Sequence, residues 1–290
     1  MNKTYAGRYR CFTLETGTLT LDGSSMFQSA PPEVWRRHFQ VEDDGSMLFA
    51  VRSLLLQSRA STVLVDTGCG DTLPQALVEE YGIHCPANSL AGSLAALGIP
   101  PDSVTHVVLT HLHLDHLGGA TLRRGGELRL AFPRAAHLVQ RAQLESALRP
   151  RTAERDSFIA EDVALLAGSN RLHVLEGPGE VLPGLEVGVA DGHTVGQQYV
   201  VVRDDRQPLL FPADVIPTAA HVPFPWFTAY DLDGRLAVRE KKLLLKRAAM
   251  ENHLVVFDHE PRFASCTVQR NGRAFTYQEN QDTRRRLTKK

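Results

Sequence analysis

The chain has 290 residues, and its 32 Lys or Arg against 33 Asp or Glu give a formal net charge of −1. With 43% hydrophobic and 22% charged residues, the composition excludes a disordered chain and predicts a globular protein with a substantial core. The near-neutral charge favours no polyanionic partner, so we expect no nucleic acid to bind. The basic ending, residues 284–290, is interpreted as a solvated tail.

Predicted strands and helices are mixed along the chain. Short runs rich in Val, Leu and Phe predict strands, which cover residues 47–57, 62–65, 105–109, 172–175, 185–189, 199–203, 209–211 and 254–257. Apolar residues at helical spacing predict helices, which cover residues 73–81, 90–97, 140–148, 159–167 and 235–250. The first two strands are expected to form a hairpin, and Asn271-Gly272 marks another near the end of the chain.

No boundary divides these elements into separate units. The sequence has no repeat of short period, no low-complexity tract and no linker rich in Pro, Gly or Ser. A single α/β domain over residues 1–290 is therefore predicted.

Signals for export or membrane insertion are missing from the sequence. Its four cysteines are scattered and form no C-x-x-C pair, which argues against a disulfide scaffold. The first twenty residues lack the apolar core of a signal peptide, and no apolar run reaches the roughly 18 residues of a membrane-spanning helix. We therefore expect a cytoplasmic protein with no membrane partner.

The strand predicted at residues 105–109 runs into the sequence His111-Leu112-His113-Leu114-Asp115-His116, which we expect to be a loop. By chance such a pattern arises only about once per thousand sequences of this composition. Imidazoles and a carboxylate are the ligands that borderline divalent metals prefer. Because four adjacent ligands do not all reach one ion and leave a catalytic position open, the pattern predicts two metal ions.

A two-metal site needs further ligands from later segments of the chain. His193 lies in the glycine-bracketed segment Gly192-His193-Thr194, between predicted strands. Asp214 follows the strand predicted at residues 209–211, and His259 follows the one at residues 254–257. Since ligands commonly lie in loops at strand ends, we expect these three residues to join the first group.

Together these motifs resemble the metallo-β-lactamase superfamily. The resemblance rests on Asp66-Thr67-Gly68, on the H-x-H-x-D-H motif, on the Gly-His-Thr segment, and on Asp214 and His259. It implies a four-layer αβ/βα sandwich with the metal site between two internally similar halves. It also implies two divalent metal ions, with Zn²⁺ expected and Mn, Co or Fe as alternatives. Carried over by position, it assigns His111, His113 and His193 to one metal, Asp115, His116 and His259 to the other, and Asp214 to both as a bridge.

Such a centre predicts metal-assisted hydrolysis. Two cations that share a carboxylate hold a water molecule as hydroxide near neutral pH, and they also polarise a carbonyl or phosphoryl oxygen of the substrate. Asp115 is the expected group that takes or relays a proton. From the resemblance, Asp66 is expected to orient a metal ligand, although it also suits a turn.

Within the superfamily, the chain is most similar to the branch of N-acyl homoserine lactone lactonases and methyl parathion hydrolase-like phosphotriesterases. The similarity rests on residues 115–119, on Gln198 after the Gly-His-Thr segment, and on residues 214–218. The lactonases carry a tyrosine three residues after the bridging aspartate, where this chain has Pro217. Tyr230 is the candidate substitute that would assist the carbonyl oxygen.

The resemblance implies a lactone or ester as the small-molecule substrate, with a phosphotriester or a thioester, as in glyoxalase II, as alternatives. It also raises the expectation of a homodimer. A noncatalytic metal- or ligand-binding module is the alternative of another class.

Several residues near these motifs have two interpretations. Cys69 has no local His or acid, so we interpret it as structural. His221 is a weak candidate for the site, because it lies close to Asp214 in the sequence. Apolar residues without clear periodicity are expected either to wall a substrate pocket or to fill the core; they are residues 223–227, Met26, Phe27, Trp35 and Phe39.

Overall fold

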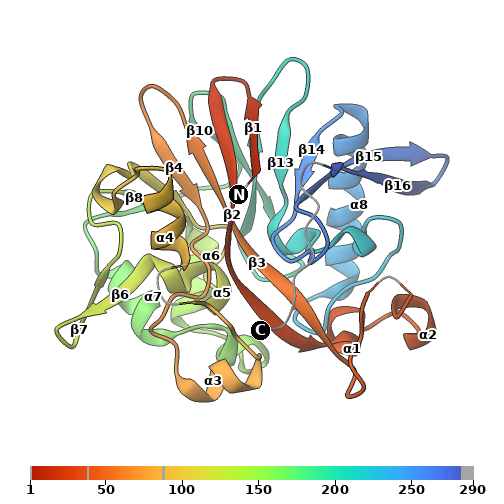
Figure 1. Ribbon diagram of the computed structural model, residues 1–290, viewed down its shortest axis with the longest axis horizontal. Coiled ribbons are helices and arrows are strands. Elements are labelled where there is room, and N and C mark those ends of the chain that lie inside the picture. The colour runs from red at the N-terminus through yellow and green to blue at the C-terminus, as the bar shows by residue number, and fades with distance from the viewer. Residues whose placement is uncertain (1, 38, 87–88, 282–290) are drawn as a thin grey trace.

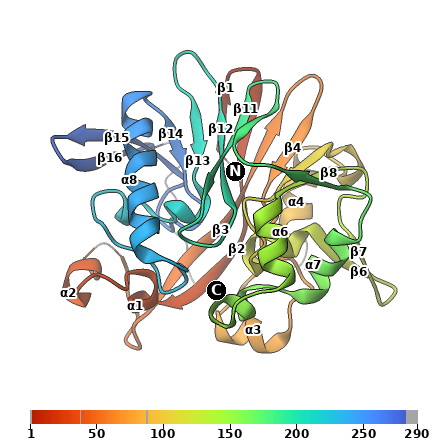
Figure 2. The same ribbon diagram turned by 180° about the vertical axis from the view of Figure 1, so that it is seen from behind.

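The computed structural model describes residues 2–37, 39–86 and 89–281. In these residues two seven-stranded sheets pack face to face, and helices cover the outer face of each sheet (Figure 1, Figure 2). This is the four-layer αβ/βα sandwich that the family resemblance implies. The basic tail at residues 284–290 lies outside the described residues.

The first sheet has the strand order β1-β2-β3-β4-β5-β8-β9. Strands β1 to β4 pair antiparallel, whereas β4, β5, β8 and β9 run parallel. Because parallel strands end at the same edge, the chain leaves β4 and β5 side by side. The strands are β1 (Asn2–Ala6), β2 (Tyr9–Asp22), β3 (Ser46–Gln57), β4 (Thr62–Val65), β5 (His106–Val108), β8 (Ala136–Gln140) and β9 (Leu172–Leu175).

The second sheet has the order β10-β11-β12-β13-β14-β15-β16. All its neighbours pair antiparallel except β13 and β14, which run parallel. The chain therefore also leaves β13 and β14 at one edge. The strands are β10 (Gly179–Leu182), β11 (Leu185–Ala190), β12 (Gln197–Val202), β13 (Leu209–Phe211), β14 (Leu254–Val256), β15 (Ser265–Asn271) and β16 (Ala274–Glu279).

The helices lie on the outside of the two sheets. Helices α4, α6 and α7 lie over the first sheet, and α8 lies over the second (Figure 2). A separate hairpin of β6 (Thr121–Arg124) and β7 (Glu127–Leu130) projects beside α7. The helices are α1 (Gly23–Met26), α2 (Pro32–Trp35), α3 (Gln75–Glu80), α4 (Ser89–Ala96), α5 (Leu114–Leu117), α6 (Arg141–Leu148), α7 (Ala160–Ala167) and α8 (Gly234–Met250).

The layers follow from the alternation of side chains along the strands. On β3, Leu54 and Leu56 face the second sheet and share a buried cluster with Val200 and Val202 of β12. Leu55 between them belongs instead to the cluster under α4, α6 and α7. Each such buried side chain stabilises the fold by about 1.5–3 kcal/mol, so both faces of the central strands contribute to the core.

The predicted strands and helices are all present, and their ends differ from the prediction by at most two residues. The expected loop at residues 111–116 is wrong in its second half, because residues 114–117 form α5. Six strands are not predicted by the sequence: β1, β2, β6, β7, β8 and β10. For β2 the reason is visible, since a bulge between Glu15 and Gly17 interrupts its pairing with β3 and its alternation is weak.

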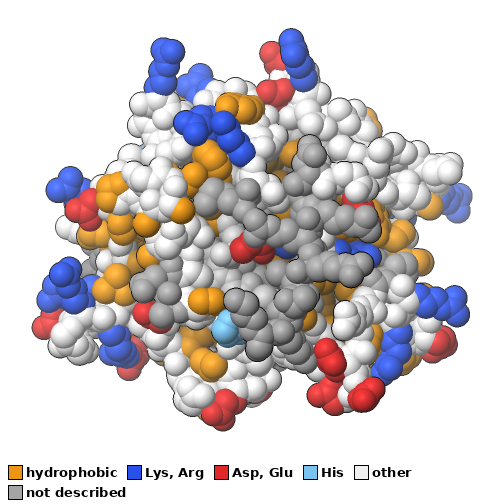
Figure 3. Space-filling view, in the orientation of Figure 1, with side chains coloured by type: hydrophobic (Ala, Val, Ile, Leu, Met, Phe, Trp, Pro, Cys, Tyr) orange, Lys and Arg blue, Asp and Glu red, His pale blue; other side chains and the backbone are white. Residues whose placement is uncertain are grey.

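The surface adds two observations. Among the described residues, no helix combines the length and apolar character needed to cross a bilayer. On the face shown in Figure 3, Lys and Arg side chains lie among Asp and Glu side chains around the edge. The charge on this face is therefore mixed in sign.

Candidate metal centre

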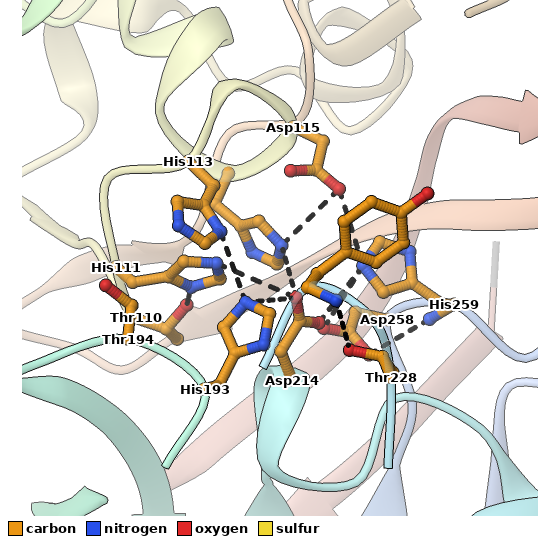
Figure 4. A network of polar contacts seen from close by, with 12 residues as sticks. Thr110, His111, His113, Asp115, His193, Thr194, Asp214, Thr228, Asp258 and His259 are labelled. Atoms are coloured by element: carbon orange, nitrogen blue, oxygen red, sulfur yellow. Dashed lines mark hydrogen bonds and ion pairs between the residues drawn. The ribbon is translucent and has the colours of Figure 1, made fainter. Parts of the chain in front are cut away.

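The ends of four strands bring the predicted ligands into one site (Figure 4). β5 leads into His111 and His113, and the short helix α5 that follows carries Asp115 and His116. His193 comes from the loop between β11 and β12, Asp214 from the turn after β13, and His259 from the segment after β14. The parallel pairs β4–β5 and β13–β14 thus deliver ligands from both sheets to the same edge of the sandwich.

A first group contains His111, His113, His193 and Asp214, whose ligand atoms all lie within 4.8 Å of one another. The Nε2 atom of His193 lies 3.0 Å from Asp214 Oδ2 and 3.1 Å from His113 Nδ1. His111 Nε2 lies 3.7 Å from the same Asp214 oxygen. These spacings suit donors around a single ion.

A second group contains His116, Asp214, Asp258 and His259, again within 4.8 Å of one another. His259 Nε2 lies 3.2 Å from Asp214 Oδ1, and His116 Nε2 lies 3.8 Å from Asp214 Oδ2. Asp115 Oδ2 lies 3.5 Å from His259 Nε2 and 3.6 Å from His116 Nε2. Asp214 is the residue that the two groups share.

The donor atoms themselves indicate a cation. The Nε2 atoms of His111, His113 and His116 and the Oδ1 atom of Asp214 are buried, and none has a hydrogen-bond partner among the described residues. Buried polar atoms are nearly always paired, so three imidazole nitrogens and one carboxylate oxygen without partners in one site need an explanation. Imidazole nitrogens and carboxylate oxygens are ligands for divalent metals, and the residues present therefore fit two such ions.

Asp66 holds one of these imidazoles in place. It follows β4 with a φ of 55°, and its Oδ2 atom accepts a hydrogen bond from His116 Nδ1 at 2.9 Å. Its Oδ1 atom accepts from the backbone N–H of Thr110 at 2.7 Å. Since Nδ1 of His116 donates to Asp66, Nε2 is the nitrogen that faces Asp214, and the geometry fits the orienting role expected for Asp66.

Two other imidazoles are held through their Nδ1 atoms. His259 Nδ1 donates to the backbone carbonyl of Ala50 on β3 at 2.8 Å. His193 Nδ1 donates to Asp231 Oδ1 at 2.8 Å. In both cases the Nε2 atom is left toward Asp214, as a metal ligand requires.

The electrostatics divide the histidines into two kinds. Burial holds the pKa of His111 and of His113 well below the ordinary value, so both are neutral. Burial also opposes charge on His116 and His193, but the nearby carboxylates outweigh it and raise the pKa to about 9 and about 10. Burial acts against Asp214 in the same way, and the surrounding imidazoles nevertheless hold its pKa well below the usual range. Protons and cations therefore compete for the atoms around Asp214.

Asp258 is a site residue that the sequence reasoning missed. It is buried, and its Oδ1 atom accepts from the backbone N–H of His259 at 3.0 Å. Burial raises its pKa to about 8, and the Asp214 carboxylate adds to the rise. The signal for this residue was its position, since it lies two residues after the end of β14 and directly precedes His259.

A pocket opens onto both groups, and Tyr230 lies in its wall. The Tyr230 ring is 6.4 Å from that of Tyr81, measured between centroids, and burial raises the Tyr230 pKa to about 12. Its hydroxyl is therefore a protonated donor at neutral pH. The pocket is lined by Leu19, Leu21, Met26, Tyr81, His113, Leu114, Asp115, Ser157, His193, Asp214, Pro217, Thr228, Tyr230 and His259.

The aromatic residues expected either to wall the pocket or to fill the core mostly fill the core. Phe27, Trp35 and Trp226 are buried in one cluster, with Phe27 stacked on Trp35 at 5.9 Å and edge-on to Trp226 at 5.3 Å. Of this set, Met26 lines the pocket. The pocket-wall interpretation is therefore wrong for Trp226, because its ring packs on Phe27 and Phe224 instead.

His221 and Cys69 have structural surroundings. His221 is buried, lies 2.8 Å from Thr218 Oγ1 through Nδ1, and donates through Nε2 to the Met26 carbonyl at 3.0 Å. Burial holds its pKa well below the ordinary value, so it is a neutral core residue. Cys69 is fully buried beside Leu114 in the same core cluster, which agrees with its structural interpretation.

Comparison with known protein families identifies the superfamily that the sequence motifs resemble. The family model described as the metallo-beta-lactamase superfamily matches residues 47–259, which span β3 to the His259 segment. The chain belongs to this superfamily. The match includes all seven predicted ligands.

Similar proteins include N-acyl homoserine lactonases. One from Bacillus thuringiensis is 25% identical, over 89% of this chain and 96% of its own length. Another, from Bacillus sp, is 26% identical over 71% of this chain and 79% of its own. The similarity therefore extends over more than three quarters of the length of each of these two relatives.

Solved structures show the same fold. A probable metal-dependent hydrolase from Staphylococcus aureus superposes with a TM-score of 0.86, at 21% identity, over 96% of this chain and 99% of that one. AidC, a dizinc quorum-quenching lactonase in complex with a product, gives 0.79 at 20% identity, over 96% and 97%. At these identities the likeness concerns the fold.

Proposed function

We propose that residues 1–290 form one domain that acts as a dinuclear metal-dependent hydrolase on a lactone or ester carbonyl. The observation that carries the proposal is Asp214, whose two oxygens face two groups of buried imidazoles. Its Oδ1 atom and the Nε2 atoms of His111 and His116 have no hydrogen-bond partner among the described residues. One carboxylate between two donor groups is the arrangement that a pair of cations requires.

In this proposal each metal would have its own imidazoles. His111, His113 and His193 would hold one ion, His116 and His259 would hold the other with Asp115, and Asp214 would contribute to both. Zn²⁺ is the proposed metal, since neutral imidazole and carboxylate donors suit it. When bound, the two ions supply Lewis acidity to the attacking water and to the substrate carbonyl.

Two side chains of the pocket wall are proposed to act on the substrate. Asp115 lines the pocket and is proposed to take the proton of the attacking water and to pass it to the leaving alkoxide. Tyr230 is proposed to donate its hydroxyl hydrogen bond to the carbonyl oxygen, as the substitute for the tyrosine that Pro217 replaces. Its raised pKa supports this role, because the phenol keeps its proton.

The lactone class is supported by the relatives and by the pocket. The relatives over most of the chain are named N-acyl homoserine lactonases. Leu19, Leu21 and Met26 give one side of the pocket an apolar surface that suits an acyl chain. We further propose a cytoplasmic location and a homodimer, both of which remain predictions.

Metal analysis and a hydrolysis screen test the proposal. Native protein is expected to contain about two metal ions per chain and to hydrolyse lactones in preference to phosphotriesters, thioesters and nitrocefin. Asp115→Ala and His116→Ala are expected to lose this hydrolysis. Preference for phosphotriesters would favour the phosphotriesterase alternative. Tight metal binding without turnover on any class would favour a noncatalytic module and contradict the proposal.

A further inference from the structure

A segment between the second sheet and α8 connects the pocket wall to the metal centre. We call residues 226–231 the strap. Two of its residues, Thr228 and Tyr230, line the pocket. The strap is tied to α1 by the Ala229 N–H, which donates to the Ser25 carbonyl at 2.7 Å, and to α8 by the buried Lys241 amine, which donates to the Trp226 carbonyl.

The last residue of the strap, Asp231, contacts a predicted metal ligand. Its side chain is 4% exposed, and its Oδ1 atom accepts the Nδ1 hydrogen of His193 at 2.8 Å. Its Oδ2 atom accepts the backbone N–H of Thr228 at 2.7 Å. One buried carboxylate therefore joins the imidazole on one side and the pocket wall on the other.

Backbone hydrogen bonds align the same two segments. The N–H of Leu232 donates to the His193 carbonyl and the N–H of Asp233 to the Gly192 carbonyl, each at 2.9 Å. The loop of His193 and the two residues that follow the strap thus run side by side. A shift of the strap would move the Asp231 carboxylate relative to the imidazole that it orients.

The orientation matters because His193 uses its other nitrogen in the site. With Nδ1–H donated to Asp231, the Nε2 atom faces Asp214 at 3.0 Å and His113 at 3.1 Å. Loss of a carboxylate that orients a ligating imidazole typically lowers metal affinity about 10- to 100-fold. The Asp231 carboxylate also accepts the Thr228 N–H, so the conformation of the strap and the orientation of His193 depend on the same carboxylate.

We propose that Asp231 is a positioning residue that couples the pocket wall to His193, so that metal binding orders the strap and the strap in turn tunes metal affinity. The inference rests on the proposed function, because it takes His193 as a metal ligand. The coupling is reciprocal by thermodynamic necessity. Asp231 touches no reacting atom in this proposal and acts through His193 and Thr228.

The chain offers a matched control two residues further on. Asp233 has the same carboxylate, and its Oδ1 atom accepts from the N–H groups of Arg235 and Leu236 at 3.0 Å each, which caps α8. The Asp233 side chain has no recorded contact with a predicted ligand among the described residues. Asp233→Ala is therefore expected to weaken the helix cap and to leave the metal centre unchanged.

The test compares Asp231→Ala, Asp231→Asn and Asp233→Ala in the full chain. Metal-free protein is titrated with Zn²⁺ by calorimetry, and amide hydrogen exchange of residues 226–231 is measured with and without Zn²⁺. Asp231→Ala is expected to lose about 10- to 100-fold in affinity for one ion of the two. It is also expected to lose the Zn²⁺-dependent protection of the strap, which native protein and Asp233→Ala retain.

The variants distinguish coupling from simple damage. Asp231→Asn keeps the size of the side chain and one acceptor oxygen, so we expect it to fold even if Asp231→Ala does not. It is also expected to lose less Zn²⁺ affinity than Asp231→Ala. Unchanged affinity and unchanged strap protection in both Asp231 variants overturn the inference while the proposed function stands. Native protein that binds fewer than two Zn²⁺ ions instead contradicts the proposed function, and the inference fails with it.

Discussion

The two groups of predicted ligands lie in one site, but the protein holds them by different means. In the first group, His193 is oriented by Asp231, a side chain on the strap. In the second, His259 is oriented by the carbonyl of Ala50, which belongs to the backbone of β3 in the middle of the first sheet. One partner is a carboxylate on a connecting segment, and the other is part of a paired strand.

The residues that contact the loops of each group show the same difference between support from connecting segments and support from the sheet. Gln143 of α6 accepts from the Leu112 N–H at 3.1 Å and donates to the Val195 carbonyl at 2.6 Å, so a single amide joins the two loops of the first group. Arg52 of β3 donates to the Glu260 carbonyl at 2.5 Å, beyond His259, and thereby ties the second group to the sheet. We infer that side chains on connecting segments hold the first group, whereas the second group is held by the backbone of β3 together with the Asp66 side chain.

The largest expected effect comes from breaking the link between the sheet and the second group. Arg52 is buried, and its Nε atom lies 2.7 Å from Glu15 Oε1. Arg52→Met leaves this carboxylate without its partner, so we expect the free energy of unfolding to fall by about 3–5 kcal/mol. Urea unfolding measures the change, and Arg10→Met on the exposed side of β2 is the control, expected within about 0.5 kcal/mol of native. Equal effects of the two substitutions would contradict this account of β3.

The Asp66 side chain orients His116, a ligand of the second group. Asp66→Asn cannot accept from both His116 and Thr110 as the carboxylate does, so we expect affinity for one of two Zn²⁺ ions to fall about 10- to 100-fold. Calorimetric titration measures this loss. Asp71→Asn, an exposed change in the same loop, is expected to leave both affinities unchanged. If Asp66→Asn also binds both ions as native protein does, the orienting role is wrong.

The strap depends on a buried lysine, which predicts a pH effect. Burial lowers the pKa of Lys241 to about 7, against 10.5 in the unfolded chain. Between these values the unfolded chain binds more protons at Lys241, so the Lys241 contribution to stability rises with pH by at most about 1.4 kcal/mol per unit, and this gain is lost as pH falls toward 7. The raised pKa values of His116 and His193 give a slope of opposite sign in this window, so the prediction concerns a difference between proteins. In urea unfolding between pH 7.5 and 9.5, Lys241→Met is expected to reduce the rise of unfolding free energy with pH relative to the native slope. The exposed neighbour substitution Lys242→Met is expected to keep it, and identical slopes for both would refute the prediction.

The smallest effect concerns the apolar side of the pocket. Leu21 lines it, so Leu21→Ala is expected to raise KM about fivefold more for long-chain than for short-chain acyl lactones, equivalent to about 1 kcal/mol of lost apolar contact. Steady-state kinetics over a chain-length series measures the difference. Trp226→Phe, inside the core, is expected to change KM equally along the series. A chain-length effect at Trp226 and none at Leu21 would reverse the assignment of the wall.

Sequence patterns reached the ligands because each follows a recognisable strand. β5, β13 and β14 are short apolar runs, and polar residues directly after them stand out. The same reasoning did not reach Asp231 or Gln143, because each lies in a segment without a motif and gains its role from a partner far along the chain. For Trp226 the sequence allowed either a pocket wall or the core, and in the structure its ring packs in the core against Phe27.

By itself, the sequence determined the local elements, the type of chemistry and the residues able to bind metal, because side-chain periodicity and ligand chemistry are local properties. Only the tertiary structure decided which nitrogen of each imidazole faces Asp214. That choice depends on what accepts the hydrogen of the other nitrogen, and for His193 and His259 the acceptors lie 38 and 209 positions away in the chain. The His259–Ala50 contact exists only once the two sheets have packed, and the His193–Asp231 contact only once the segment before α8 lies against the loop between β11 and β12.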